Sequence, residues 1–154
     1  MTDEHAAACL VEVGDAFPTA TLVDLDGESV ALASLYGPKL TVVVVWRASH
    51  PYAVAALRDM TNLIERPFAA EGVQVVGINV GDPGTTVQEV TDSGGIAYPQ
   101  LLDEEETLYA QLATSLLPRI YLLDEAGRVV WLDVEYAVAT QRHLRHAVRF
   151  MLSH

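Results

Sequence analysis

Two almost continuous apolar runs predict the centre of a β-sheet. Residues 40–46 (LTVVVVW) and residues 73–80 (VQVVGINV) are rich in β-branched side chains and show no regular alternation of apolar and polar positions. A half-exposed strand alternates, whereas a strand covered on both faces is apolar throughout. We therefore expect both segments to be central strands of a sheet that is covered on both sides.

Two further pairs of strands are predicted to be hairpins. An Asp-Gly pair separates residues 21–25 from residues 29–32, and this dipeptide favours a tight turn between strands. The tetrapeptide Asp-Glu-Ala-Gly separates residues 117–123 from residues 128–134 in a similar way. One hairpin therefore precedes the apolar runs and the other follows them.

An amphipathic helix is predicted shortly after the first apolar run. Its apolar residues recur at helical spacing and form one stripe: Ala53, Ala56, Leu57, Met60, Leu63 and Ile64. Pro67 is expected to kink or end this helix, and Gly72 to close the segment.

Two more helices complete the predicted order of elements. Thr85 or Thr86 is expected to cap a helix that ends at residues 94–95 (Gly-Gly), and Thr140 to cap the last helix. The resulting order is a hairpin, two strand–helix units, a further helix, a hairpin and a final helix. This order implies an α/β fold with a mixed central β-sheet and helices on both faces.

The acidic run at residues 103–106 (DEEE) has two interpretations. Four successive carboxylates resemble a metal site, but Asp103 followed three residues later by Glu106 also has the spacing of a capping box. Carboxylates suit the positive end of a helix dipole. We favour the capping box, and the sequence predicts no metal site and no cofactor.

Length and charge narrow the classes of function. A chain of 154 residues, 51% of them hydrophobic, can form one domain without disulfides or a structural metal. We expect an N-terminal tail at residues 1–12 and a domain at residues 13–154. The net charge of −12 argues against nucleic acid and anionic membranes as partners. The acidic N-terminus lacks the features of a signal peptide, which predicts a cytoplasmic protein, and the oligomeric state is left open.

Three motifs occur in the order and at the separations of one known family. They are GDAFP to YG at residues 14–37, the strand at residues 42–46 with the turn and helix after it, and LPRIYLLDEAG at residues 117–127. Together they resemble the redoxin branch of the thioredoxin superfamily, which includes the AhpC/TSA proteins and the thiol–disulfide oxidoreductases of cytochrome maturation. The resemblance covers nearly the whole chain. It implies a thioredoxin-like sandwich with a four- or five-stranded central sheet and an N-terminal β-hairpin extension.

The chain departs from this family at the place where the family carries its W-C-x-x-C active site. Aligned on Trp46, the two cysteine positions hold His50 and Ala53, and a one-residue shift gives Pro51 and Val54 instead. Thiol–disulfide exchange needs an attacking thiolate and a second, resolving thiol. Neither is present at this junction, so the resemblance implies a degenerate active site.

The resemblance nevertheless implies a groove that does not depend on cysteine. In the family the proline of the third motif is cis and faces the active site, and the backbone beside it pairs with an extended segment of the substrate. The residues that this comparison places at the groove are Trp46, Arg47, Ser49, His50, Tyr52, Leu117, Pro118 and Arg119. We therefore expect a redox-inactive binding or scaffold module whose partner is a protein or peptide segment.

Residues at this junction, and the single cysteine, also allow functions other than peptide binding. His50, at a helix N-terminus, is a candidate base or lone metal ligand, or simply a surface replacement for the lost thiol. Arg47 and Arg119 are candidates for a carboxylate or phosphate site, or for ordinary pairing with acidic neighbours. Cys9 is the only cysteine, and the sequence places no basic residue beside it. An enzyme that uses Cys9 as an oxidoreductase or peroxidase, or a non-thiol activity at His50, is the alternative function.

Overall fold

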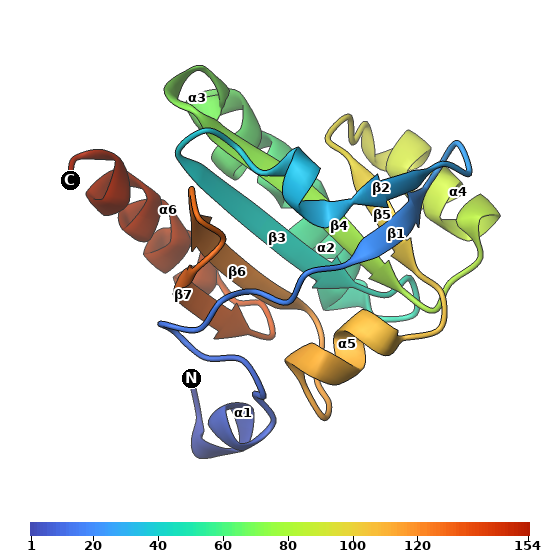
Figure 1. Ribbon diagram of the computed structural model, residues 1–154, viewed down its shortest axis with the longest axis horizontal. Helices are drawn as coiled ribbons and strands as arrows, with labels where there is room; N and C mark the ends of the chain where they lie inside the picture. Colours follow the sequence, from blue (N-terminus) through green and yellow to red (C-terminus); the bar gives the residue numbers. More distant parts are fainter.

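Seven strands form one mixed sheet in the computed structural model, which describes residues 1–154 (Figure 1). The strands are β1 (Thr21–Asp24), β2 (Ser29–Ala31), β3 (Leu40–Trp46), β4 (Val73–Val80), β5 (Gln100–Asp103), β6 (Arg119–Asp124) and β7 (Val129–Val134). Their order across the sheet is β2-β1-β5-β4-β3-β6-β7. β3 and β5 pair parallel with the central strand β4, and all other neighbours pair antiparallel.

The register of β3 divides the core into two layers. Val42 lies opposite Val75 of β4 and Leu122 of β6, and every residue of β3 is buried. Because successive side chains point to opposite faces, Val42, Val44 and Trp46 enter one core while Val43 and Val45 enter the other. This double burial explains why the strand lacks polar alternation.

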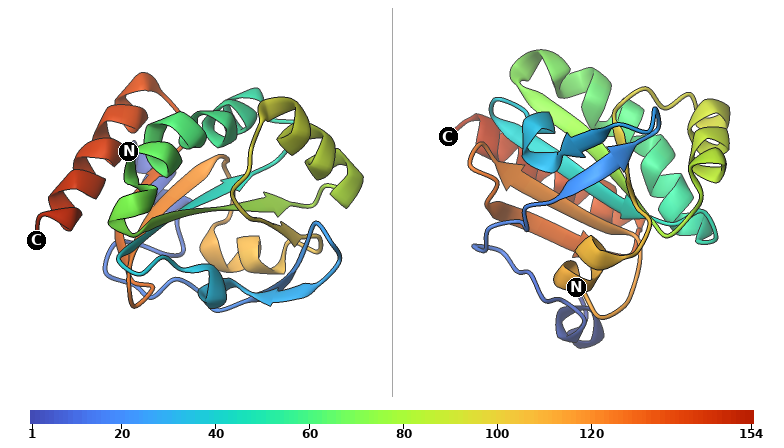
Figure 2. Two further views of the ribbon diagram at one scale, coloured as in Figure 1. Left: turned by 90° about the horizontal axis from the view of Figure 1, so that it is seen from above. Right: turned by 45° about the vertical axis from the view of Figure 1, so that its right-hand side comes forward.

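Helices cover both faces of the sheet (Figure 2). One face packs against α2 (Pro51–Met60), α4 (Gly84–Gly94) and α6 (Val138–Leu152), and the other against α5 (Thr107–Leu112). The N-terminal helix α1 (Asp3–Ala7) lies beside α5. No helix is long and apolar enough to span a membrane.

The helix α2 continues toward Pro67 through irregular turns. A π-helical turn, η2 (Thr61–Glu65), leads into α3 (Arg66–Phe68) and a 3-10 turn, η3 (Ala69–Glu71). Gly72 then ends the segment with a φ of 87°, the left-handed conformation that glycine adopts without strain. The predicted irregularity at the proline and the predicted end at the glycine are both confirmed.

The thioredoxin-like α/β fold is confirmed, with three differences in its elements. Thr140, predicted to cap the last helix, lies within the first turn of α6, and Ala137 holds the cap position. The short strand β5 was not predicted, although it joins the N-terminal hairpin to the central sheet. The helix α4 begins at Gly84 without a side-chain cap, so the prediction of a threonine cap at Thr85 or Thr86 was wrong. The predicted end of this helix at Gly94 and Gly95 is confirmed.

Residues 1–12, predicted as an N-terminal tail, contain α1 and pack against the rest of the chain. Thr2 caps α1, and Ala8 and Val11 are buried. The backbone of this segment pairs with the end of α5: Leu10 N–H donates to the Leu112 carbonyl at 2.9 Å. The segment packs through Val11, which belongs to the same apolar cluster as Leu108 and Leu112 of α5.

The acidic run caps a helix through Asp103, as predicted, but Glu106 does not complete the predicted capping box. Asp103 is the buried end of β5, and its carboxylate accepts hydrogen bonds from the amides of Leu108 at 3.2 Å and Tyr109 at 2.8 Å. Glu106 occupies the cap position with a φ of 60° and makes no side-chain cap bond. Asp103 therefore caps α5 from a distance, and Glu106 is free to bind elsewhere.

Candidate functional site

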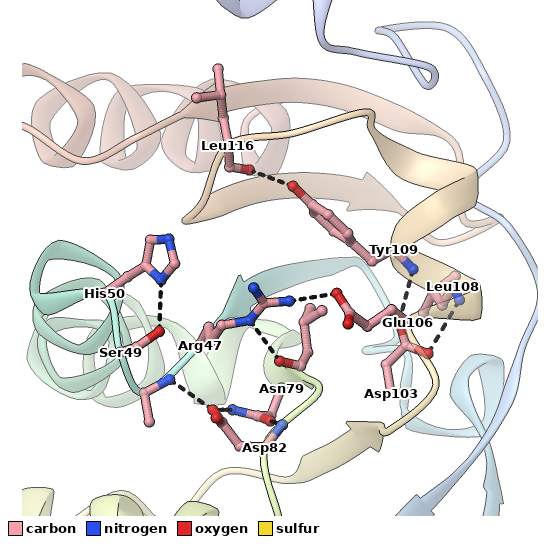
Figure 3. A network of polar contacts seen from close by, with 12 residues as sticks. Arg47, Ser49, His50, Asn79, Asp82, Asp103, Glu106, Leu108, Tyr109 and Leu116 are labelled. Carbon is pink, nitrogen blue, oxygen red and sulfur yellow. Dashed lines mark hydrogen bonds and ion pairs between the residues drawn. The ribbon is translucent and has the colours of Figure 1, made fainter.

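The turn from β3 into α2 places the residues at the two cysteine positions very differently. His50 is the N-cap residue of α2, and its side chain makes no capping hydrogen bond. Its Nδ1 atom lies 3.2 Å from the Ser49 hydroxyl, and the imidazole is half-buried (Figure 3). Ala53 is fully buried against the core. An accessible polar group therefore remains at only one of the two positions.

A small polar network holds this turn in place. Asp82, in the loop after β4, accepts hydrogen bonds from the Ala48 amide and the Asn79 side chain, both at 2.8 Å. The side-chain oxygen of Asn79 (Oδ1) accepts in return from the backbone N–H of Asp82 at 3.0 Å. The ends of the parallel strands β3 and β4 are thereby tied together. Sequence reasoning missed these two residues, although a polar Asn79 near the end of an apolar run was a visible signal.

Arg47 is occupied by partners within the protein. Its Nε donates to the Val80 carbonyl at 3.0 Å, and its Nη2 forms an ion pair with Glu106 at 2.5 Å. The interpretation as ordinary pairing with an acidic neighbour is therefore correct. The alternative of an anion site needs Arg47 and Arg119 side by side, but Arg47 is paired with Glu106 and Arg119 binds the N-terminal segment.

Two predicted groove residues, Trp46 and Arg119, do not reach the groove. Trp46 is fully buried in the core under α2, where its Nε1 donates to the Gln100 Oε1 at 3.1 Å. Arg119 is also fully buried, on the face of the sheet that packs against α5 and the N-terminal segment. Strand alternation is the reason, since Arg119 lies two positions before Tyr121 on β6 and therefore shares its face.

This position of Arg119 corrects a second expectation, the absence of a basic neighbour for Cys9. The Arg119 Nη1 atom donates to the Cys9 sulfur at 3.3 Å, although 110 positions separate the two residues. Local sequence carries no signal of this contact. It follows from the docking of the N-terminal segment.

The segment before β6 presents an unpaired stretch of backbone. The Leu117–Pro118 peptide bond is cis, and the Pro118 carbonyl accepts from the Glu135 amide at 2.8 Å. The Leu116 carbonyl accepts from the Tyr109 hydroxyl at 3.1 Å. Between them, the N–H and C=O groups of Leu117 have no hydrogen-bond partner within the protein.

An open pocket lies between this backbone and the start of α2. It encloses about 600 Å³ and is lined by six residues: His50, Tyr52, Leu117, Glu135, Tyr136 and Ala137. Tyr52 is 71% exposed. The structure thus brings together three of the predicted residues, His50, Tyr52 and Leu117, and Ser49 lies directly beside them.

Three pocket residues were missed because they follow the predicted end of the last strand. Glu135 has a φ of 66°, and its carboxylate lies 3.1 Å from the His5 Nε2 atom, a contact that links the pocket wall to α1. The Tyr136 hydroxyl donates to the Asp59 carboxylate at 2.8 Å. Burial, together with this carboxylate, raises the pKa of Tyr136 above its usual value, so the hydroxyl stays a donor at neutral pH. No local motif marks this loop as part of a site.

Comparison with known proteins places the chain in a family. A family model described as Redoxin matches residues 12–147. The thiol-disulfide oxidoreductase ResA of Halalkalibacterium halodurans is 27% identical over 121 residues, which cover 79% of this chain and 68% of that protein.

Solved structures agree on the fold. The solution structure of a Bacteroides thetaiotaomicron protein has a TM-score of 0.85 at 23% identity, and covers 96% of this chain and 94% of that one. The crystal structure of peroxidoxin BcpB from Mycobacterium tuberculosis has a TM-score of 0.77 at 19% identity, and covers 90% of this chain and 97% of that one. With a thioredoxin-like fold and a family match over most of its length, the chain belongs to the Redoxin family.

Proposed function

We propose that this protein is a thiol-independent binding module that holds an extended segment of a protein partner in the pocket beside Leu117 and Pro118. The observation that carries the proposal is the unpaired backbone of Leu117, which borders an open pocket. A free N–H and C=O at the end of a strand are the groups that strand addition uses. The partner would supply the missing acceptor and donor.

The side chains of the pocket suit such a segment. Tyr52 and Tyr136 present aromatic surface on two sides, and Leu117 adds an apolar contact. Exposed tyrosine is enriched at protein interfaces, because a rigid ring buries a large area with little loss of entropy. The backbone would fix the direction of the partner, and the aromatic rings would select its side chains.

The alternative activities have less support at this site. Dithiol exchange at His50 and Ala53 lacks a sulfur nucleophile, although the curated relative named above is a thiol-disulfide oxidoreductase. His50 contacts a serine hydroxyl and no carboxylate that would orient it as a base. The cytoplasmic location and the protein nature of the partner remain predictions.

Selection of peptides by display on the purified protein, followed by affinity measurements, tests the pocket. Tyr52→Ala and Leu117→Gly should each weaken the affinity of a selected peptide by about tenfold, the loss of one interface contact. N-methylation of the peptide amide that pairs with Leu117 should have a similar effect. Val138→Ala is the matched control, because Val138 is 76% exposed and lies outside the pocket.

Two outcomes would overturn the proposal. Unchanged affinity in both pocket variants would show that the peptide binds elsewhere. Catalytic reduction of insulin disulfides by the purified protein would show that thiol chemistry persists. We expect insulin reduction at the rate of the blank reaction.

A further inference from the structure

A buried guanidinium without a carboxylate partner lies on the face of the sheet that packs against α5. Arg119 is fully buried, and the two ion pairs of the protein join His5 to Glu135 and Arg47 to Glu106. Its Nε donates to the Leu116 carbonyl at 3.1 Å, and its Nη2 to the carbonyls of Ser115 at 2.7 Å and Ala8 at 3.3 Å. A buried charge is costly unless a counter-charge compensates it.

The remaining partner of Arg119 is the Cys9 sulfur, 3.3 Å from Nη1. Among the four hydrogen-bond acceptors of this guanidinium, three are neutral carbonyls, and only the sulfur can become negatively charged. The thiolate is the nucleophilic form of cysteine, and an adjacent arginine stabilises negative charge that develops on sulfur. Cys9 is half-buried, and its thiol also donates to the His5 carbonyl at 3.3 Å.

A second observation at the same place is a buried hydroxyl that lacks a hydrogen-bond partner. The Tyr121 side chain is fully buried, and its hydroxyl has no hydrogen-bond partner. Tyr121 follows Arg119 by two residues on β6, so both side chains leave the same face of the strand. Burial raises the pKa of Tyr121 to about 12; the nearby Arg119 guanidinium opposes this rise, and negative charge on Cys9 adds to it. It is therefore a spare donor within the Cys9–Arg119 cluster.

We propose that Cys9 is a site of oxidation by small hydroperoxides, hydrogen peroxide above all. The sulfur attacks one peroxide oxygen, so that an S–O bond forms while the O–O bond breaks. Sulfur loses two electrons and becomes a sulfenic acid. The other peroxide oxygen gains those electrons and leaves as water, after taking up the proton that the thiol released. Arg119 and Tyr121 then hold the new sulfenic oxygen.

The absence of a second cysteine fixes the stoichiometry of this reaction. Cys9 is the only thiol, so no resolving cysteine within the chain can reduce the sulfenic acid. Each chain consumes one peroxide and then stops. This modification site is separate from the peptide pocket, and it holds whether or not the pocket binds a peptide.

Trapping with dimedone, which reacts with sulfenic acids, tests the proposal by intact-protein mass spectrometry. After peroxide treatment, the native protein should carry one dimedone adduct, and the Cys9→Ser variant none. This variant also controls for oxidation of the three methionines. The native protein should react at least about tenfold faster than the same chain unfolded in urea, the effect of one charge-assisted hydrogen bond. Equal rates in the folded and unfolded chain would overturn the proposal.

The role of the spare hydroxyl is tested separately. Tyr121→Phe keeps the ring and should slow peroxide oxidation about fivefold, the effect of one neutral hydrogen bond. Tyr36→Phe is the control, because Tyr36 is a half-buried tyrosine outside the cluster. An unchanged rate in Tyr121→Phe would overturn the assignment of this hydroxyl. Urea midpoints of both variants establish that they are folded.

Discussion

The buried side chains of Trp46 and Gln100 are joined by a single hydrogen bond. The indole Nε1 donates to Gln100 Oε1, while Gln100 Nε2 has no partner. Gly77 lies against this amide, since a Cβ atom there would come within 2.1 Å of Gln100 Oε1. The space for Gln100 thus depends on a residue without a side chain on the neighbouring strand.

We expect Trp46→Phe to lower the free energy of unfolding by about 1–3 kcal/mol. The substitution leaves a buried amide with neither of its side-chain atoms bonded, and this is the usual cost of one unsatisfied group. Urea denaturation gives the value, with Trp131→Phe as control, because Trp131 is only partly buried and its indole makes no hydrogen bond. The affinity of a pocket peptide should not change. Weaker peptide binding by this variant would show that Trp46 contributes to the pocket.

The errors in the predicted site concern the direction of single side chains. Arg119 begins β6, and because side chains alternate along the strand it shares the face of Tyr121, the layer that packs against α5. Trp46 adjoins the groove in sequence, yet it belongs to the same layer as Val42 and Val44. The resemblance to the family located the turn and the proline. Which side chains meet there depends on the face of the sheet to which each strand residue points.

At the scale of elements, the N-terminal segment stabilises the end of α5 and the start of β6. It supplies two of the partners of Arg119, the Ala8 carbonyl and the Cys9 sulfur. It also buries Ala8 and Val11. A segment that looked like a tail in the sequence therefore compensates a buried charge.

Removal of residues 1–12 should lower the free energy of unfolding by about 2–5 kcal/mol. This range corresponds to breaking a buried charged contact while the other group stays in place. Urea denaturation of the shortened and full chains gives the difference. Leu10→Ser is the matched control, because Leu10 is 54% exposed within the same segment and should change stability little. Equal stability of both chains would show that the segment only rests on the surface.

Elements were predictable to the extent that they carry their own pattern. The observed bounds of β3 and β4, residues 40–46 and 73–80, are those that the apolar runs predicted. β5 has only four residues, and α1 has only five. Such short segments are ordered by their neighbours in space and not by local periodicity, so a single sequence did not reveal them.

For the whole molecule, the sheet separates two chemical environments. The peptide pocket forms at the end of β3 that leads into α2, close to the loop after β7. Arg119 and Tyr121 lie on the face of the sheet that packs against α5, and Cys9 of the N-terminal segment contacts Arg119 there. Leu117, the residue of the pocket with free backbone groups, is only two positions from Arg119. The two environments are therefore linked by one short stretch of chain, and the Leu117 side chain also packs against the layer that contains Tyr121.

The buried tyrosines also determine how the stability of the whole domain responds to alkali. Burial raises the pKa of Tyr121 to about 12, and burial raises the pKa of Tyr98 and Tyr136 well above the usual value. An unfolded chain releases its phenolic protons near pH 10. Between about pH 10 and pH 12 the unfolded state therefore binds fewer protons than the folded state, and stability falls as the pH rises.

We expect the free energy of unfolding to be steady just below pH 10 and to fall by about 2 kcal/mol or more toward pH 12, since each unit of separation in pKa is worth about 1.4 kcal/mol. Urea denaturation at a series of pH values measures the decline, and phenolate absorbance in the ultraviolet follows ionisation in the folded protein. Tyr121→Phe should show a shallower decline, because it removes one of the buried phenols. Two results together would contradict this prediction: a constant free energy of unfolding over this range, and ionisation of all six tyrosines near pH 10 in the folded chain. They would show that Tyr98, Tyr121 and Tyr136 are not buried.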